Sequence, residues 1–525
     1  MAGFVDVLLR GLLLTLVSVA AGGVPWLRAV LRAEPGAKPD RAGAASLRLI
    51  AVAAALAAAV QAAVAGLVLV DLAGKTGSPP LGDFLETTFA RVALARVVLA
   101  AALAAVAARL AAAPAGRAAW GALAGLAAAL VAASAALSHA MARIDDRALL
   151  LVLDAVHQAA VAAWVGGLAH LTLHAVRARG EAEPRDRQLA RRFSTLAAAA
   201  VSVLVASGVA LGGLYVGEPA ALVGTAYGVM ILSKVALLVV ALGLAAANAR
   251  LVRRAAAAVT TPRLARFVEV ELGLAVTVVY AAASLTSLPP AIDVTADRAT
   301  VGEVLARFAP APPRLTSPPI DELLRTADPL MAPPGERKPV ERAWSEYNHH
   351  WSGMFVLLMG LLAIGERAGL RAGRHWPLAL LGLAAFMFVR NDPRAWPLGP
   401  AGFWESMTLP DVLQHRAFVV LIVAFGVFEW MVRTGRLAPR PWAYVFPLLC
   451  ALGGGMLLTH SHAMFNLKEE FLTEVTHAPL GILGALAGWA RWLELRLPEA
   501  GAAPGWIWRA CLVGVGLFLL LYREG

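Results

Sequence analysis

Long apolar runs recur along this chain and constrain its fold more than any other feature. A helix of about 20 apolar residues crosses a bilayer, and lipid admits only helices or closed barrels because backbone polar groups must be satisfied internally. Eight runs lie at about 4–26, 45–70, 89–111, 118–139, 148–174, 194–215, 224–249 and 268–288, and six more at about 350–366, 375–390, 411–432, 441–460, 472–493 and 506–522. The alternating pattern of barrel strands is absent. The sequence therefore predicts an all-α polytopic membrane protein with about 14 transmembrane helices.

Composition excludes several other classes of protein. Of the 525 residues, 59% are apolar and 15% charged, whereas soluble proteins are nearer 45–50% apolar and about 25% charged. An ordinary soluble enzyme, a disordered chain and a fibrous protein are therefore excluded. The two cysteines, Cys450 and Cys511, lie inside apolar runs. They form no CxxC motif and predict no disulfide framework.

A proline-rich break divides the apolar runs into two groups. Residues 289–349 contain eleven prolines. Within them, Thr300 and Glu303 have the spacing of a helix capping box, and 320–325 is expected to form a second short helix. We therefore predict three parts: an eight-helix domain at 1–288, an extracytoplasmic linker at 289–349, and a six-helix, histidine-rich domain at 350–525.

The arginines predict the orientation of the chain. Six arginines lie in the connection 175–193 and five in 250–267, whereas 216–223 has no basic residue. Because basic loops stay in the cytoplasm, both termini are predicted to be extracytoplasmic. The same distribution explains the net charge of +11 without a nucleic-acid partner. We expect the first run, which has no basic residue before Arg10, to be a helix and not a cleaved signal peptide.

Seven of the eleven histidines fall near the predicted outer face. They are His139, His349, His350, His415, His460, His462 and His477. Methionines accompany them at helical spacing, namely Met354, Met456 and Met464. Imidazole is the commonest metal ligand and thioether sulfur favours cuprous copper, so this layer predicts a shared metal or haem site in the second half. Interfacial histidines and packing methionines are the alternative interpretation.

Carboxylates lie close to two of these histidines. Asp411 precedes His415 by one turn, and Glu474 precedes His477 by three residues. Both are candidate supporting residues for a metal site. A negative charge near a helix N-terminus is the simpler explanation for each.

The first half has a separate polar cluster in its fifth run. Asp154 lies one turn before His157, and Trp164 follows two turns later. A neighbouring carboxylate would fix the tautomer of the His157 ring and make it a better metal ligand. We expect Lys234, at mid-depth in the seventh run, to pair with Asp154, because a buried lysine must pair or lose its charge. A cluster that only holds helices together is the alternative.

Several of these residues carry a family resemblance. His157, Trp164-Val165-Gly166-Gly167, Arg192-Phe193-Ser194, Ser207-Gly208, Tyr227-Gly228, Lys234 and Asn248 follow one another in an order and spacing that resembles the CopD (PcoD) copper-resistance membrane protein family, most clearly over about 140–250. The second half resembles the C-terminal extension of longer CopD-type proteins at 346–351, 413–416, 459–462 and 476–479. The resemblance implies an inner-membrane protein that moves copper, often beside a periplasmic CopC-like partner. No Met-rich or His-rich loading tail is present.

The expected function is therefore copper transport or homeostasis in the bacterial inner membrane, with copper bound by outer-face His and Met ligands. One alternative is a membrane cytochrome whose haem is ligated by His415 and His477, or by His350 and His460. Another is a copper-delivery assembly factor for a respiratory oxidase. The sequence contains no nucleophile constellation and no phosphate-binding glycine loop. We therefore expect neither an enzyme nor an ATP-driven pump.

Overall fold

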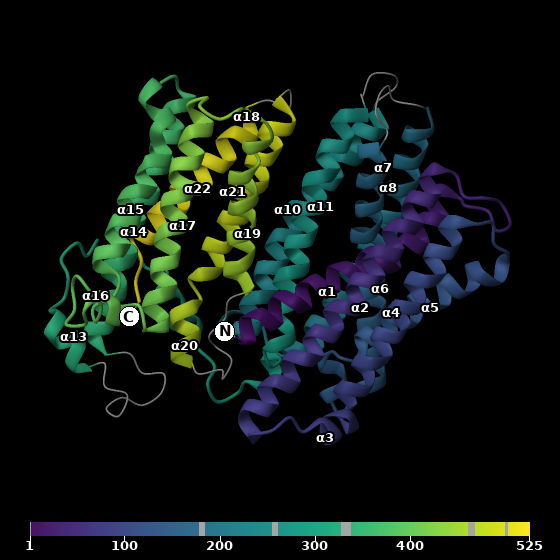
Figure 1. Cartoon of the computed structure of the whole chain (residues 1–525), viewed down its shortest axis with the longest axis horizontal. Helices are drawn as coiled ribbons and strands as arrows, with labels where there is room; N and C mark the ends of the chain where they lie inside the picture. Colours follow the sequence, from purple (N-terminus) through teal and green to yellow (C-terminus); the bar gives the residue numbers. More distant parts are fainter. Residues whose placement is uncertain are drawn as a thin grey trace. The chain divides into compact units, whose positions relative to one another are not determined.

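The computed structural model describes residues 2–177, 184–254, 261–326, 338–459, 468–498 and 502–524. Every regular element in these ranges is helical (Figure 1). Contacts divide the chain into two compact units. The first unit comprises 1–222, 230–295 and 459–461, and the second comprises 223–229, 296–458 and 462–525. The predicted division into domains at 288 and 349 stays a prediction.

Long antiparallel helices form the first unit. They are α1 (Ala2–Pro25), α2 (Arg41–Thr76), α4 (Thr88–Ala112), α5 (Arg117–Ala135), α6 (Arg147–Val161), α7 (Gly167–Arg177), α8 (Pro184–Val216), α10 (Ala226–Arg254) and α11 (Thr261–Ser284). The short α3 (Leu81–Glu86) joins α2 to α4 at one end of that pair (Figure 1). Buried side chains such as Trp26, Leu47, Ile50 and Leu103 fill the interior.

The second unit is built around the packed pair α14 (Pro339–Arg367) and α22 (Ala503–Leu520). Its other long helices are α15 (Ala379–Arg390), α17 (Pro410–Arg433), α19 (Val445–Thr459) and α21 (His477–Arg496). The 3-10 helix η6 (Arg371–Leu378) leads into α15. Short helices lie at the two ends of this unit: α13 (Ile320–Thr326), α16 (Phe403–Ser406) and α20 (Lys468–Glu474) at one, and α18 (Pro439–Trp442) at the other (Figure 1).

Twelve helices in the described part of the chain are long and apolar enough to cross a membrane. They confirm the predicted all-α polytopic membrane protein. The predicted runs 350–366 and 472–493 are also helical, as α14 and α21, but they fall outside the twelve. The physical reason is polar composition, because α14 contains His349, His350 and a Glu366-Arg367 end, and α21 contains Arg491, Glu494 and Arg496.

The proline-rich segment contains the two short helices that its sequence predicts. Helix α12 (Val301–Arg307) begins with the expected capping box, in which Thr300 and Glu303 each accept a hydrogen bond from the other's backbone N–H. Helix α13 confirms the second prediction. The long helix α14 begins at Pro339, eleven residues earlier than the predicted run, because proline suits the first turn of a helix and Glu341 accepts the Lys338 backbone N–H.

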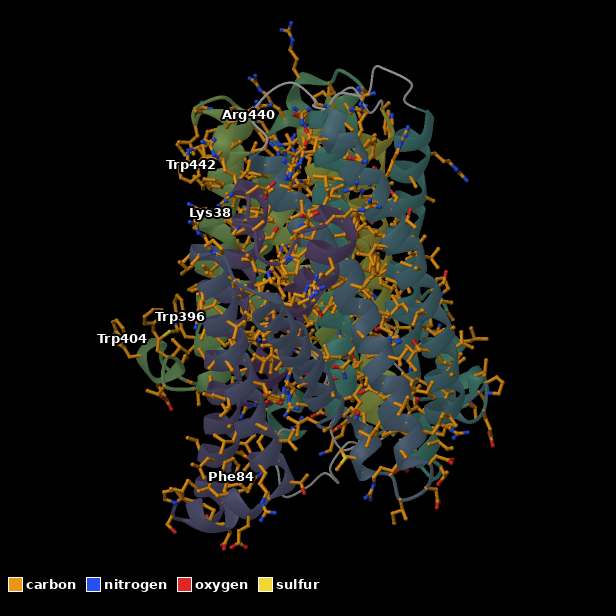
Figure 2. All side chains as sticks on the ribbon, turned by 90° about the vertical axis from the view of Figure 1, so that its right-hand side faces the viewer. Lys38, Phe84, Trp396, Trp404, Arg440 and Trp442 are labelled. Carbon is orange, nitrogen blue, oxygen red and sulfur yellow. The ribbon has the colours of Figure 1, made fainter. Side chains whose placement is uncertain are left out.

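Exposed aromatic side chains mark the connection between α15 and α17. Trp396 and Trp404 project from the ribbon (Figure 2), and Trp404 is 80% exposed. Trp396 contacts Phe403 edge-on, and Phe403 in turn contacts Trp404. Tryptophans in such positions are typical of the membrane–water interface.

Two features of the first unit shape its polar sites. Gly166 packs against α1, and a Cβ atom at Gly166 would overlap the backbone carbonyl of Ser18. The two helices therefore cross closely at this point. Beside the crossing, η3 (Ala162–Gly166) is a π-helical turn between α6 and α7. Such turns insert one residue into a helix and are frequent at functional sites.

Candidate functional site

His157 lies on α6, where its ring faces α8. Its Nδ1 is 3.1 Å from the Ser207 hydroxyl oxygen. That hydroxyl has one proton, and its shortest contact is the 2.7 Å bond to the Val203 carbonyl of its own helix. We therefore assign His157 Nδ1–H as the donor to Ser207, which leaves the lone pair on Nε2. Neutral imidazole with an unprotonated nitrogen is the metal-binding form.

Gly208 makes room for this ring. A Cβ atom at Gly208 would lie 3.2 Å from His157 Cε1, which is tighter than ordinary packing. The Ser207-Gly208 pair thus positions the histidine and holds its Nδ1.

Asp154 and Lys234 complete the polar cluster around His157. Asp154 accepts a hydrogen bond of 2.9 Å from Gln158 Nε2. The charges of Asp154 and Lys234 attract each other, but the described atoms of the two residues form no ion pair within 4.0 Å. The expected partnership is therefore an interaction at longer range than a contact pair.

His139 lies near this cluster at the start of the 3-10 turn η2 (His139–Ala142). Its Nε2 is 2.7 Å from the Leu285 carbonyl, to which it donates. The ring also contacts Tyr215 edge-on, with centroids 6.4 Å apart. The Leu285 bond makes Nε2–H the protonated side of this ring, in contrast to His157.

A second polar site surrounds Trp164, which lies in the π-helical turn. The Trp164 Nε1–H donates to Glu271 Oε1 at 3.4 Å, and Asn248 Nδ2 donates to Glu271 Oε2 at 2.9 Å. Glu271 is 4% exposed, and Asn248 Oδ1 is buried without a hydrogen-bond partner. The sequence analysis did not single out Glu271. Its signal was a carboxylate within the apolar run 268–288, which is the same kind of signal that identified Asp154.

His349, His415 and His477 are candidate histidines of the second unit whose ring contacts the structure describes. His349 and His477 are neighbours from α14 and α21, with ring centroids 6.4 Å apart. His349 also stacks on Tyr522 at 4.1 Å, and its Nδ1 donates to the Ser345 carbonyl at 2.8 Å. His415 is on α17, where its Nδ1 is 2.7 Å from Asp392 Oδ1. Asp392 is therefore a carboxylate partner of His415.

His350 is fully buried and bonds to backbone on both sides of its ring. Its Nδ1 accepts the Arg314 backbone N–H at 2.6 Å, and its Nε2–H donates to the Tyr522 carbonyl at 2.8 Å. Neither nitrogen retains a lone pair for a metal or a haem iron in this arrangement. His350 therefore fastens the linker and the C-terminal segment to α14.

The remaining candidates of the second half are only partly described. His460, His462 and Met464 lie outside the described residues, as does the side chain of Asp411. Met354 on α14, Met456 on α19 and Glu474 on α20 are half-buried. Within the described ranges, no group of three or more His, Cys, Asp or Glu side chains is placed to hold a metal ion.

The comparison with protein families bears on the first unit. Residues 187–285 match the model of the family described as CopD, copper resistance protein D. This segment of the chain is similar to the CopD family. The match covers about a fifth of the chain and runs from α8 to the end of α11. No curated protein and no solved structure matches the chain.

The CopD segment supplies one side of both polar sites of the first unit. Ser207 and Lys234 belong to the polar cluster around His157, and Asn248 and Glu271 belong to the polar site around Trp164. Their partners His157 and Trp164 precede the matched segment, on the helix from Arg147 to Arg177. The chain is a multi-pass membrane protein with a segment that matches a copper-resistance family.

Proposed function

We propose that this chain is a copper transport and homeostasis protein of the bacterial inner membrane, with copper as its cargo and His157 Nε2 as a ligand in the first unit. The observation that carries the proposal is the His157–Ser207 hydrogen bond. It joins the ring to the CopD segment through Nδ1 and leaves Nε2 as the coordinating nitrogen. A hydrogen bond of this kind orients a metal-ligating histidine and raises its basicity.

The Trp164–Glu271–Asn248 site, which we call the inner site, is proposed as the next binding site for the ion after His157. Trp164 follows His157 by two helical turns, which is roughly 10 Å along the axis. The buried carboxylate of Glu271 and the unpartnered carbonyl of Asn248 are oxygen donors that a cation could contact in passing. Conduction requires sites that are weak or numerous enough to release the ion, and a neutral imidazole followed by oxygen donors meets that requirement.

In the second unit we propose His349 and His477 as a capture pair at the extracytoplasmic face. The bond from His349 Nδ1–H to Ser345 makes Nε2 its unprotonated nitrogen, as in His157. His415, His460, His462, Met354, Met456 and Met464 stay proposed ligands of the same layer. A periplasmic CopC-like protein is the proposed donor of copper to this face, and the termini are proposed to lie on the same side.

Titration of the purified full-length protein with cuprous copper against a chromogenic chelator tests the proposal. We expect the His157→Ala variant to lose one copper equivalent, and a His349→Ala/His477→Ala double variant to lose another. The matched control is His174→Ala, because His174 lies at the other end of the same helix, where it pairs with Asp186 at 2.9 Å. Unchanged stoichiometry and affinity in both test variants would overturn the assignment. A Soret band in the same sample would favour the haem alternative.

A further inference from the structure

A dense charge network lies within the second unit, at the end where α14 and α17 finish. Glu494 is its central residue. One carboxylate oxygen of Glu494 accepts hydrogen bonds from Arg367 and Arg509. The other oxygen accepts hydrogen bonds from Arg491 and Trp508. Arg433 joins the network through Glu429 at 2.9 Å and Glu366 at 3.0 Å. Charged groups inside a membrane protein are costly and mark functional sites.

The network has one more positive charge than negative. Its four arginines are Arg367, Arg433, Arg491 and Arg509, and its three glutamates are Glu366, Glu429 and Glu494. Several members are deeply buried, with the Arg433 side chain 8% exposed and Glu429 3% exposed. An uncompensated charge in such a place is expensive. The excess of one positive charge is the amount that one monovalent anion neutralises.

Buried donors without partners lie in the same place. Arg433 Nη2, Arg491 Nε and Trp376 Nε1 are all buried and form no hydrogen bond, and Trp376 is fully buried. Their rings and guanidinium groups share one neighbourhood. The Arg433 guanidinium carbon is 5.1 Å from the Trp376 ring centroid and 5.5 Å from that of Trp508, and the Arg491 carbon is 5.4 Å from the latter.

The geometry points to a binding site for a small monovalent inorganic anion, such as chloride, between Arg433, Arg491 and Trp376. Three unpartnered N–H donors and one surplus positive charge are what an anion of this class requires, since buried donors without partners cost free energy. One buried acceptor, Glu429 Oε2, also lacks a partner. It would repel an anion, so it is not among the proposed ligands. This inference is independent of copper handling.

Chloride dependence of the purified full-length protein tests the site. The thermal unfolding midpoint is measured while chloride replaces gluconate at constant ionic strength, and the chlorine-35 NMR line width reports binding directly. We expect a saturable rise of the midpoint and a broadened line that bromide narrows by competition. An unfolding midpoint that does not change with chloride, together with an unbroadened chlorine-35 line, would overturn the proposal. Water would then be the partner of the three donors.

Two variants assign the effect to these residues. Trp376→Phe removes only one N–H donor and a little volume, so the apparent dissociation constant for chloride should rise about tenfold, as expected for one bond to a charged partner. Arg433→Gln should abolish the chloride dependence of the unfolding midpoint. If Arg433→Gln fails to fold, the chloride affinity of Trp376→Phe still tests the site. The control is Trp506→Phe, whose ring is exposed over Arg367. A Trp376→Phe variant with wild-type chloride affinity would contradict the assignment.

Discussion

His157 on α6 and Ser207 on α8 are joined by a 3.1 Å hydrogen bond that holds the imidazole by its Nδ1. The serine belongs to the CopD segment, and the histidine lies outside it. The bond therefore links the family segment to the helix that carries the proposed copper ligand. Its chemical consequence is an unprotonated nitrogen at Nε2.

Replacing Ser207 by alanine removes this bond and keeps the ligand. We expect the copper affinity of the first-unit site to fall about 10- to 100-fold, the usual effect of losing a hydrogen bond behind a metal-ligating histidine. The control is Ser202→Ala, because Ser202 is exposed on the same helix and bonds only to the Ala198 carbonyl. Chelator competition on both variants checks the prediction, which equal affinities would contradict.

Glu271→Gln tests the inner site. The substitution keeps the size of the side chain and removes its negative charge, so copper movement into proteoliposomes should slow by at least about tenfold, as the loss of roughly 1.4 kcal/mol of ion stabilisation implies. Copper binding at His157 should change little. Glu269→Gln on the same helix is the control. Transport at the wild-type rate in the Glu271 variant would remove this residue from the pathway.

His350 and His349 are adjacent in sequence but have different expected roles. His350→Ala leaves the Arg314 N–H and the Tyr522 carbonyl without their partner, so the free energy of unfolding should fall by about 2–4 kcal/mol. Copper stoichiometry should be unchanged. His349→Ala should show the opposite pattern, with lost copper and a smaller change in stability. Thermal unfolding and metal analysis of both variants separate the two roles, and a copper loss confined to His350→Ala would contradict the assignment.

The Glu303–Lys468 pair gives a pH dependence. The hydrogen bond from Lys468, reinforced by the backbone and hydroxyl of Thr300, lowers the pKa of Glu303 to about 2 from an ordinary value of 4.5. Because the folded-state pKa is lowered, the pair stabilises the protein fully above about pH 4.5. That stabilisation is lost as the pH falls from 4.5 toward 2.

The measurement is the difference in unfolding midpoint between wild type and Glu303→Gln. We expect this difference to be constant between pH 6 and 8 and to shrink steadily below about pH 4.5, as linkage requires. Glu322→Gln, at an exposed position on α13, should show no such trend. A difference that grows toward acid pH would be incompatible with a lowered pKa.

Much of this fold could be predicted from the sequence because lipid leaves few choices. Twelve of the predicted runs meet the requirements for crossing a membrane, and the capping box at Thr300 and Glu303 forms as its spacing predicts. The two exceptions, α14 and α21, carry charged residues at the ends that build the Glu494 network. A hydropathy criterion selects helices with apolar surfaces. Helices α14 and α21 do not meet it because they contribute polar side chains to contacts in the interior.

The candidate site was less predictable because hydrogen-bond partners come from distant positions. Position along a helix indicated that His157 and Trp164 were unusual, but Ser207 and Glu271 lie 50 and 107 residues away from them. Depth alone grouped His350 with His349. Its two backbone bonds depend on Arg314 and Tyr522, which no helical spacing could associate with it. The convergence of all six second-half histidines stays a prediction, because His460 and His462 lie outside the described residues.

X-ray absorption at the copper edge tests the central claim most directly. The full-length protein is loaded with copper, and the multiple-scattering signature of imidazole is compared between wild type and His157→Ala. We predict that the variant loses the signal of one imidazole ligand together with one bound copper, while His174→Ala retains both. An identical spectrum and copper content in His157→Ala would contradict the assignment of His157 as a copper ligand.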